Sequence, residues 1–203
     1  MNDPLIAWQR LRAGNEHFFV PLRGHRAAPA EDRPHAVVFR CADAAVASEI
    51  VFGQSWGSLL DVSNWGHVID SGVLATMEYA VETLDVPLIV VLGHEECQAV
   101  RAGMRAWHEA VIPDGATRTV VEKVMSSIVR RGVGAESIES VSPAHIVNTG
   151  LSLMEQSPLI ARRIDAGRCG IVCASVDPDT GRLRSHAAIG PVGETSDSLL
   201  ECV

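Results

Sequence analysis

Short apolar runs alternate along this chain with longer segments in which apolar residues recur at helical spacing. Between residues 71 and 84, Leu74, Met77, Val81 and Leu84 fall on one face of a helix, and Ser71 is a suitable N-cap. The run 88–92 is the strongest strand pattern. The pattern predicts strands at 36–39, 59–62, 88–92, 170–172 and 183–189 and helices at 4–20, 45–52, 71–84, 95–111, 117–131 and 143–166, the last interrupted near Pro158. Strands that alternate with helices predict an α/β fold with a mainly parallel central sheet flanked by helices.

Length and composition restrict the class of protein. A chain of 203 residues is enough for one well-buried domain, so we expect a single domain over residues 1–203. The 17 basic and 25 acidic residues form no basic stripe, which argues against a nucleic-acid partner. We expect no membrane association, because the longest apolar run is too short to cross a bilayer. The five irregularly spaced cysteines favour reduced thiols or metal ligands in a cytoplasmic protein over a disulfide framework.

Metal-binding residue types follow two of the predicted strands. Cys41 lies at the end of the strand pattern at 36–39, and His94 and Cys97 follow the run 88–92. Thiolates and imidazole are preferred ligands of Zn²⁺. Because ligands gather at the carboxyl ends of parallel strands, the two motifs are expected to meet in space. Three such ligands leave a fourth tetrahedral position, and its occupant (water or another side chain) decides whether the protein is a catalyst.

These motifs are similar to those of the β-class carbonic anhydrases, which carry Cys-x-Asp-x-Arg after one strand and Gly-His-x-x-Cys-Gly after another. The corresponding segments here are 41–45 (CADAA) and 93–98 (GHEECQ), and segments 7–18, 66–71, 77–81 and 86–94 also resemble the family. The resemblance implies Zn²⁺ bound by Cys41, His94 and Cys97, with Asp43 orienting a zinc-bound water. It implies reversible hydration of CO₂ to bicarbonate as the activity. It also implies a homodimer or larger homo-oligomer, in which the helix at about 4–20 packs on a partner subunit.

The sequence departs from the family around these ligands. Ala45 replaces the arginine that would pair with the carboxylate of Asp43. Two thiolates already neutralise Zn²⁺, so this carboxylate adds an uncompensated negative charge, which it can relieve by ligating zinc, by protonation or by finding another cation. The loop at 63–67 lacks an arginine found in the family, and Gln98 replaces a glycine. Candidate substrate-pocket residues are Trp65, Gly66, His67 and Gln98.

Three hypotheses follow from the motifs and their departures. The first is a zinc-dependent, carbonic-anhydrase-like lyase whose activity is reduced by Ala45. The second is an enzyme on the same scaffold that acts on another small electrophile, such as a sulfur analogue of CO₂ or a small carbonyl compound. The third is a non-catalytic zinc protein in which Asp43 closes the site as fourth ligand. The sequence leaves the role of Asp43 open between water orientation and zinc ligation.

Overall fold

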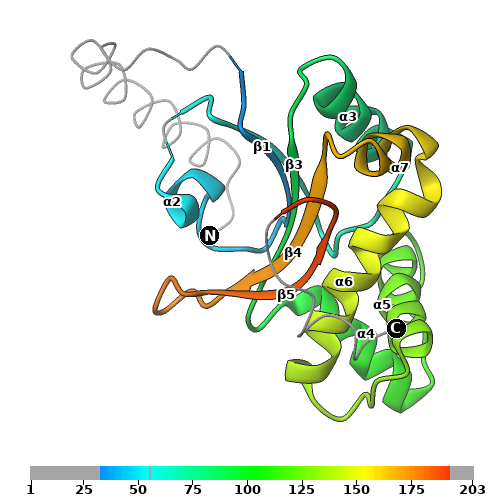
Figure 1. Ribbon diagram of the computed structural model, residues 1–203. Helices are drawn as coiled ribbons and strands as arrows, with labels where there is room; N and C mark the ends of the chain where they lie inside the picture. Colours follow the sequence, from blue (N-terminus) through cyan, green and yellow to red (C-terminus); the bar gives the residue numbers. More distant parts are fainter. Residues whose placement is uncertain (1–32, 55, 193–203) are drawn as a thin grey trace, which may run out of the picture. The chain divides into compact units, whose positions relative to one another are not determined.

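A five-stranded sheet in the order β2-β1-β3-β4-β5 organises the part of the chain that the computed structural model describes, residues 33–54 and 56–192 (Figure 1). The strands are β1 (Ala36–Cys41), β2 (Leu59–Asn64), β3 (Leu88–His94), β4 (Gly170–Val176) and β5 (Leu183–Ile189). The first four strands are parallel to one another, and β5 is antiparallel to β4. The prediction of a mainly parallel sheet is confirmed.

The position of a strand in the sheet explains its sequence pattern. The central strands β1 and β3 are buried along almost their whole length, so both faces require apolar residues and the runs are continuous. The edge strands β2 and β5 are only partly buried, and their sequences are more polar.

Helices cover both faces of this sheet. They are α2 (Ser48–Phe52), α3 (Ser71–Glu82), α4 (Gln98–Glu109), α5 (Thr117–Arg131), α6 (Ile138–Gln156) and α7 (Pro158–Asp165). The main core joins α3, α6 and α7 to one face of the sheet through residues such as Phe39, Met77 and Leu153. Residues of α2 pack against the opposite face, and α4 and α5 lie beside α6 (Figure 1). None of the helices in the two described ranges is both long and apolar enough to span a bilayer.

Several helix boundaries differ from the predictions; α2, for example, begins at Ser48 and not at residue 45. Asp70, and not Ser71, caps α3, because its Oδ1 accepts the backbone N–H of Val73 at 2.9 Å. Helix α4 begins at Gln98 because Glu96 has a left-handed φ of 58°, which a helix interior excludes. The segment predicted as 143–166 forms two helices and starts earlier, at residue 138. The predicted helix at 4–20 lies outside the described residues.

The junction between α6 and α7 is set by Ser157. Its backbone is extended, which ends α6. Its side chain accepts the N–H of Ile160 at 3.2 Å and so caps α7, in which Pro158 is the first residue. The interruption predicted near Pro158 is therefore confirmed.

The parallel register brings the ends of β1 and β3 together. Phe39 pairs with Val91 and Arg40 with Leu92, so the two strands finish at the same edge of the sheet. Cys41 and His94 are the last residues of these strands. The fold thus positions two motifs that are about fifty residues apart along the chain next to each other.

Candidate metal centre

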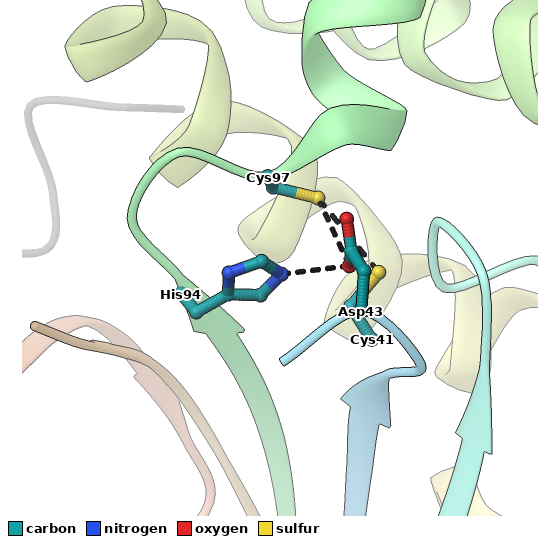
Figure 2. A group of neighbouring side chains, drawn as sticks. All are labelled: Cys41, Asp43, His94 and Cys97. Carbon is teal, nitrogen blue, oxygen red and sulfur yellow. Dashed lines mark hydrogen bonds and ion pairs between the residues drawn. The ribbon is translucent and has the colours of Figure 1, made fainter. Parts of the chain in front are cut away.

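Four side chains converge at the carboxyl edge of the sheet (Figure 2). Cys41 ends β1, Asp43 lies in the turn after it, His94 ends β3, and Cys97 is the N-cap residue of α4. One potential ligand atom from each lies within 4.8 Å of all the others. The cluster therefore has the composition and proximity that a metal ion needs.

The distances within the cluster suit a tetrahedral ion. The sulfur atoms of Cys41 and Cys97 are 3.7 Å apart. Two sulfurs bound to one zinc at about 2.3 Å each would lie about 3.8 Å apart. Oδ1 of Asp43 lies 3.9 Å from the Cys97 sulfur and 2.8 Å from Nε2 of His94. A carboxylate oxygen therefore lies within reach of the position that a fourth ligand would take.

Backbone groups orient two of these side chains. His94 donates from Nδ1 to the carbonyl of Glu95 at 2.8 Å, which directs Nε2 at the cluster. Asp43 accepts the backbone N–H of Gln98 at Oδ2, at 2.9 Å. That N–H belongs to the first turn of α4, where amide groups have no partner within the helix and the helix dipole favours an anion.

The sulfur of Cys41 accepts a hydrogen bond from the protein backbone. The N–H of Gly66 lies 3.1 Å from the Cys41 sulfur, and both groups are buried. Gly66 has a left-handed φ of 77°, and a Cβ at this residue would lie 2.4 Å from Cγ1 of Val120. Only glycine therefore brings this backbone so close to the sulfur.

Without metal, the four side chains of the cluster have pKa values shifted in different directions. The hydrogen bond with Cys97, and then burial, raise the pKa of Cys41, whereas the hydrogen bond from Cys41 lowers the pKa of Cys97. Burial opposes the charged forms of Asp43 and His94. Their hydrogen bonds outweigh this, so the pKa of Asp43 is lowered and that of His94 raised. Binding of a metal would displace the protons held on Cys41 and His94.

Comparison with known proteins identifies the family. The sequence profile of the carbonic anhydrase family matches residues 36–183. Carbonic anhydrase 2 of Mycobacterium tuberculosis is 42% identical over 203 residues, which covers 95% of this chain and 97% of that protein. The chain belongs to the β-class carbonic anhydrase family. Members of this family are lyases.

Solved structures of β-carbonic anhydrases share the fold. A Coccomyxa β-carbonic anhydrase in complex with acetazolamide matches with a TM-score of 0.73 at 19% identity, covering 97% of this chain and 92% of that one. One of two tetrameric β-carbonic anhydrases from Sordaria macrospora matches with a TM-score of 0.66 at 20% identity, over 91% of this chain and 94% of that one.

The site of this β-carbonic anhydrase differs from the family motif beside Asp43. Ala45 is exposed and offers no charge to the carboxylate. Arg40 lies close to the same turn but donates from Nε to Asp61 at 2.8 Å, and from Nη1 to the carbonyl of Ala44 at 3.4 Å. Its guanidinium therefore hydrogen-bonds the backbone of the turn and not the carboxylate of Asp43, which accepts the N–H at the start of α4.

The four candidate pocket residues lie around the centre in different environments. Trp65 packs against the apolar cluster that contains both metal-site cysteines, and Gly66 contacts Cys41. His67 is buried, donates from Nε2 to the carbonyl of Leu92 at 3.1 Å, and meets Phe39 edge-on. Gln98 is exposed and bonds back to Glu96. Their role in a substrate pocket stays a prediction.

A cavity of about 220 Å³ borders His94. None of the four predicted pocket residues lines it. Its walls come from the ends of β3 and β4, the start of α6, and β5. The residues that line it include Glu95, Glu139, Ser175, Arg184 and His186.

One buried network near the centre was not predicted as part of the site. His145 on α6 is fully buried and bonds from Nε2 to the carbonyl of Gly66 at 3.0 Å. Its Nδ1 lies 2.9 Å from Oγ of Ser127, and the same oxygen accepts from Nδ2 of Asn148. The sequence does carry a signal, because His145, Asn148 and Ser152 are polar residues at helical spacing in a buried helix.

Proposed function

We propose that this chain binds Zn²⁺ through Cys41, His94 and Cys97 and catalyses the reversible hydration of CO₂ to bicarbonate. The observation that carries the proposal is the convergence of two sulfurs and one imidazole nitrogen at distances suited to tetrahedral zinc. Membership of the β-carbonic anhydrase family supports CO₂ as the substrate.

The metal ligands and the residues around them have different roles in the proposed reaction. When bound, zinc lowers the pKa of water toward neutrality and so supplies the nucleophile that CO₂ hydration requires. The two thiolates and His94 hold the ion, and the hydrogen bond to Glu95 keeps the imidazole in the right tautomer. Asp43 controls the fourth position, because its Oδ1 lies among the other ligand atoms.

Reduced activity is part of the proposal. Hydration needs the fourth position free for water, and Asp43 must then withdraw far enough to accept a hydrogen bond from that water. The N–H of Gln98 holds Oδ2 of Asp43 in the inward position, and Ala45 provides no cation to draw the carboxylate away. The closed arrangement, with Asp43 at the fourth position, is therefore more favoured here than in a family member that has the arginine.

The same geometry favours a second candidate, a zinc protein without catalysis. If Asp43 remains bound as fourth ligand, the tetrahedron is complete and the ion stabilises the fold. The proximity of Asp43 Oδ1 to the ligand atoms of the other three residues supports this alternative.

We further propose a cytoplasmic homo-oligomer, at least a dimer. The tetrameric state of the Sordaria macrospora enzymes supports an assembly of this kind. Irregularly spaced cysteines, among which Cys41, Cys97, Cys169 and Cys173 are free thiols, support a reducing compartment.

Metal analysis and stopped-flow CO₂ hydration test the proposal on the same preparations. Wild-type protein should bind one zinc per chain and hydrate CO₂ faster than buffer at mildly alkaline pH. Cys97→Ser should lose both properties, whereas Cys169→Ser should keep both, since Cys169 is a buried thiol far from the cluster in sequence and bonded to Gly170. One zinc per chain without hydration would favour the closed, non-catalytic protein, and absence of zinc would refute both candidates.

A further inference from the structure

Gly66 connects the metal cluster to a buried histidine. Its N–H lies 3.1 Å from the Cys41 sulfur, and its carbonyl lies 3.0 Å from Nε2 of His145. Both contacts are buried, so neither competes with bulk water. The two bonds act on the peptide groups on either side of one α-carbon, and together they fix the orientation of the amide that faces the sulfur.

The protonation of His145 follows from its partners. A carbonyl only accepts, so Nε2 of His145 carries the hydrogen and donates to Gly66. Burial lowers the pKa of His145 to about 4, so the ring is neutral near pH 7 and Nδ1 is an acceptor. The hydroxyl of Ser127 lies 2.9 Å from Nδ1 and 3.0 Å from the carbonyl of Lys123, so these two acceptors share its one hydrogen.

Further contacts hold Ser127 and His145 in place. Asn148 donates from Nδ2 to the Ser127 hydroxyl at 3.0 Å, and both residues are buried. The ring of His145 also meets the ring of His67 edge-on, with 6.0 Å between ring centroids. The imidazole is therefore fixed in orientation by Gly66, by Ser127 on α5 and by the ring of His67.

We propose that His145 is a positioning residue for the metal-binding thiolate of Cys41, acting through Gly66. An N–H directed at a thiolate withdraws charge from the sulfur and orients its lone pairs, and such outer contacts tune a metal site strongly. Without His145, the carbonyl of Gly66 loses a buried donor, and the adjoining peptide, which carries the Gly66 N–H, loses a constraint on its orientation toward the sulfur. This inference rests on the zinc site proposed above, although not on CO₂ hydration.

Cobalt substitution provides a readout that a purely structural role would not move. Co²⁺ bound to thiolates gives a sulfur-to-cobalt charge-transfer band whose energy reports the charge on the sulfur. In His145→Leu the band should shift to lower energy, because a thiolate without its hydrogen bond gives up charge more readily. Zinc affinity, measured by competition with a chelator, should fall by about 10-fold or more. His145→Gln retains an N–H donor and should restore both properties toward wild type.

A matched control separates this effect from the general loss of a histidine. His108 donates from Nε2 to the carbonyl of Ala135 at 2.8 Å, the same kind of bond made without Gly66. His108→Leu should leave the charge-transfer band where it is in wild type. Ser127→Ala removes the hydroxyl that contacts Nδ1 of His145 and helps to hold the ring, and it should shift the band in the same direction as His145→Leu but less far.

Each outcome bears on the inference in a defined way. An unmoved band in a folded His145→Leu protein would overturn it. If that variant fails to fold, an unmoved band in Ser127→Ala would do the same. Wild-type protein that binds neither cobalt nor zinc would instead refute the proposed metal site, a failure visible before any variant is compared.

Discussion

The backbone N–H of Gln98 holds the carboxylate of Asp43 at 2.9 Å, with the second carboxylate oxygen directed into the metal cluster. The anchor is the first amide of a helix, so it combines a hydrogen bond with the favourable end of the helix dipole. In the family motif an arginine two residues after the aspartate competes for this carboxylate. Here that residue is Ala45, and the helix has no such competitor from position 45.

An arginine at position 45 should open the site. Ala45 is exposed, so the longer side chain has room and its charge can draw Asp43 outward. A partly exposed charge pair is worth up to about 1 kcal/mol, so Ala45→Arg should raise the rate of CO₂ hydration by about fivefold. Stopped-flow assays of zinc-loaded protein measure this.

The neighbouring Ala42 is also exposed and provides a control for added charge. Ala42→Arg should raise the rate less than Ala45→Arg does. Equal gains in the two variants would mean that general electrostatics, and not the pairing with Asp43, limits the reaction.

Arg40 should stabilise the turn that carries Asp43. It bridges Asp61 and the carbonyl of Ala44, and Asp61 also accepts the hydroxyl of Ser48 at 2.5 Å. The pair is partly shielded from water, with side-chain exposures of 20% and 28%. A double-mutant cycle of Arg40→Met and Asp61→Asn in urea unfolding should give a coupling free energy of about 0.5–1 kcal/mol. Additive effects of the two substitutions would show that the pair contributes no stability.

Gly66→Ala should be among the costly single substitutions in the described part of the chain. The alanine would adopt a left-handed φ, at about 1 kcal/mol, and its Cβ would meet Cγ1 of Val120 at 2.4 Å. Overpacking adds about 1–3 kcal/mol, so the free energy of unfolding of metal-free protein should fall by about 3 kcal/mol. Thermal or urea unfolding provides the measurement.

Gly53 separates the two contributions. It has a similar φ of 60°, but a Cβ there would meet nothing within 4 Å. Gly53→Ala should therefore cost only about 1 kcal/mol. Val120→Ala should recover part of the loss in the Gly66→Ala background, and failure to do so would place the cost elsewhere than in this contact.

Acid should destabilise the fold through two buried histidines. Burial lowers the pKa of His145 to about 4 and that of His67 to about 3, from an ordinary value of 6.5. The unfolded chain thus takes up protons below pH 6.5 while the folded chain does not. The stabilisation is complete above pH 6.5 and falls as the pH drops toward 4, by about 1.4 kcal/mol per pH unit for each histidine.

His145→Gln removes one of these two groups. We expect the free energy of unfolding of this variant, measured with a chelator present so that the protein is metal-free, to decline less steeply below pH 6.5 than that of wild type. The difference in slope should correspond to about one proton fewer taken up on unfolding. Parallel pH profiles for the two proteins would show that His145 titrates alike in the folded and unfolded states.

The alternation of strands and helices, and the residues able to ligate a metal, can be predicted from the pattern of residue types. The central strands are buried on both faces, which requires continuous apolar runs such as 88–92 that can be recognised without a structure. Cys41, His94 and Cys97 are recognisable because few residue types bind zinc, because Cys41 and His94 lie at predicted strand ends, and because Cys97 follows His94 in a His-x-x-Cys motif. Local signals failed at the helix starts, where Asp70 competed with Ser71 and a left-handed Glu96 delayed α4.

The surroundings of these ligands, in contrast, depend on how the chain folds. The contacts of Asp43 with Gln98, of Gly66 with Cys41 and of His145 with Gly66 join residues that are 25 to 79 positions apart. Such contacts depend on strand register, helix packing and backbone conformation, none of which is written in a local pattern of residue types. The physical reason is that a carbonyl or an N–H is present at almost every residue, so only the fold selects which one meets the sulfur or the carboxylate.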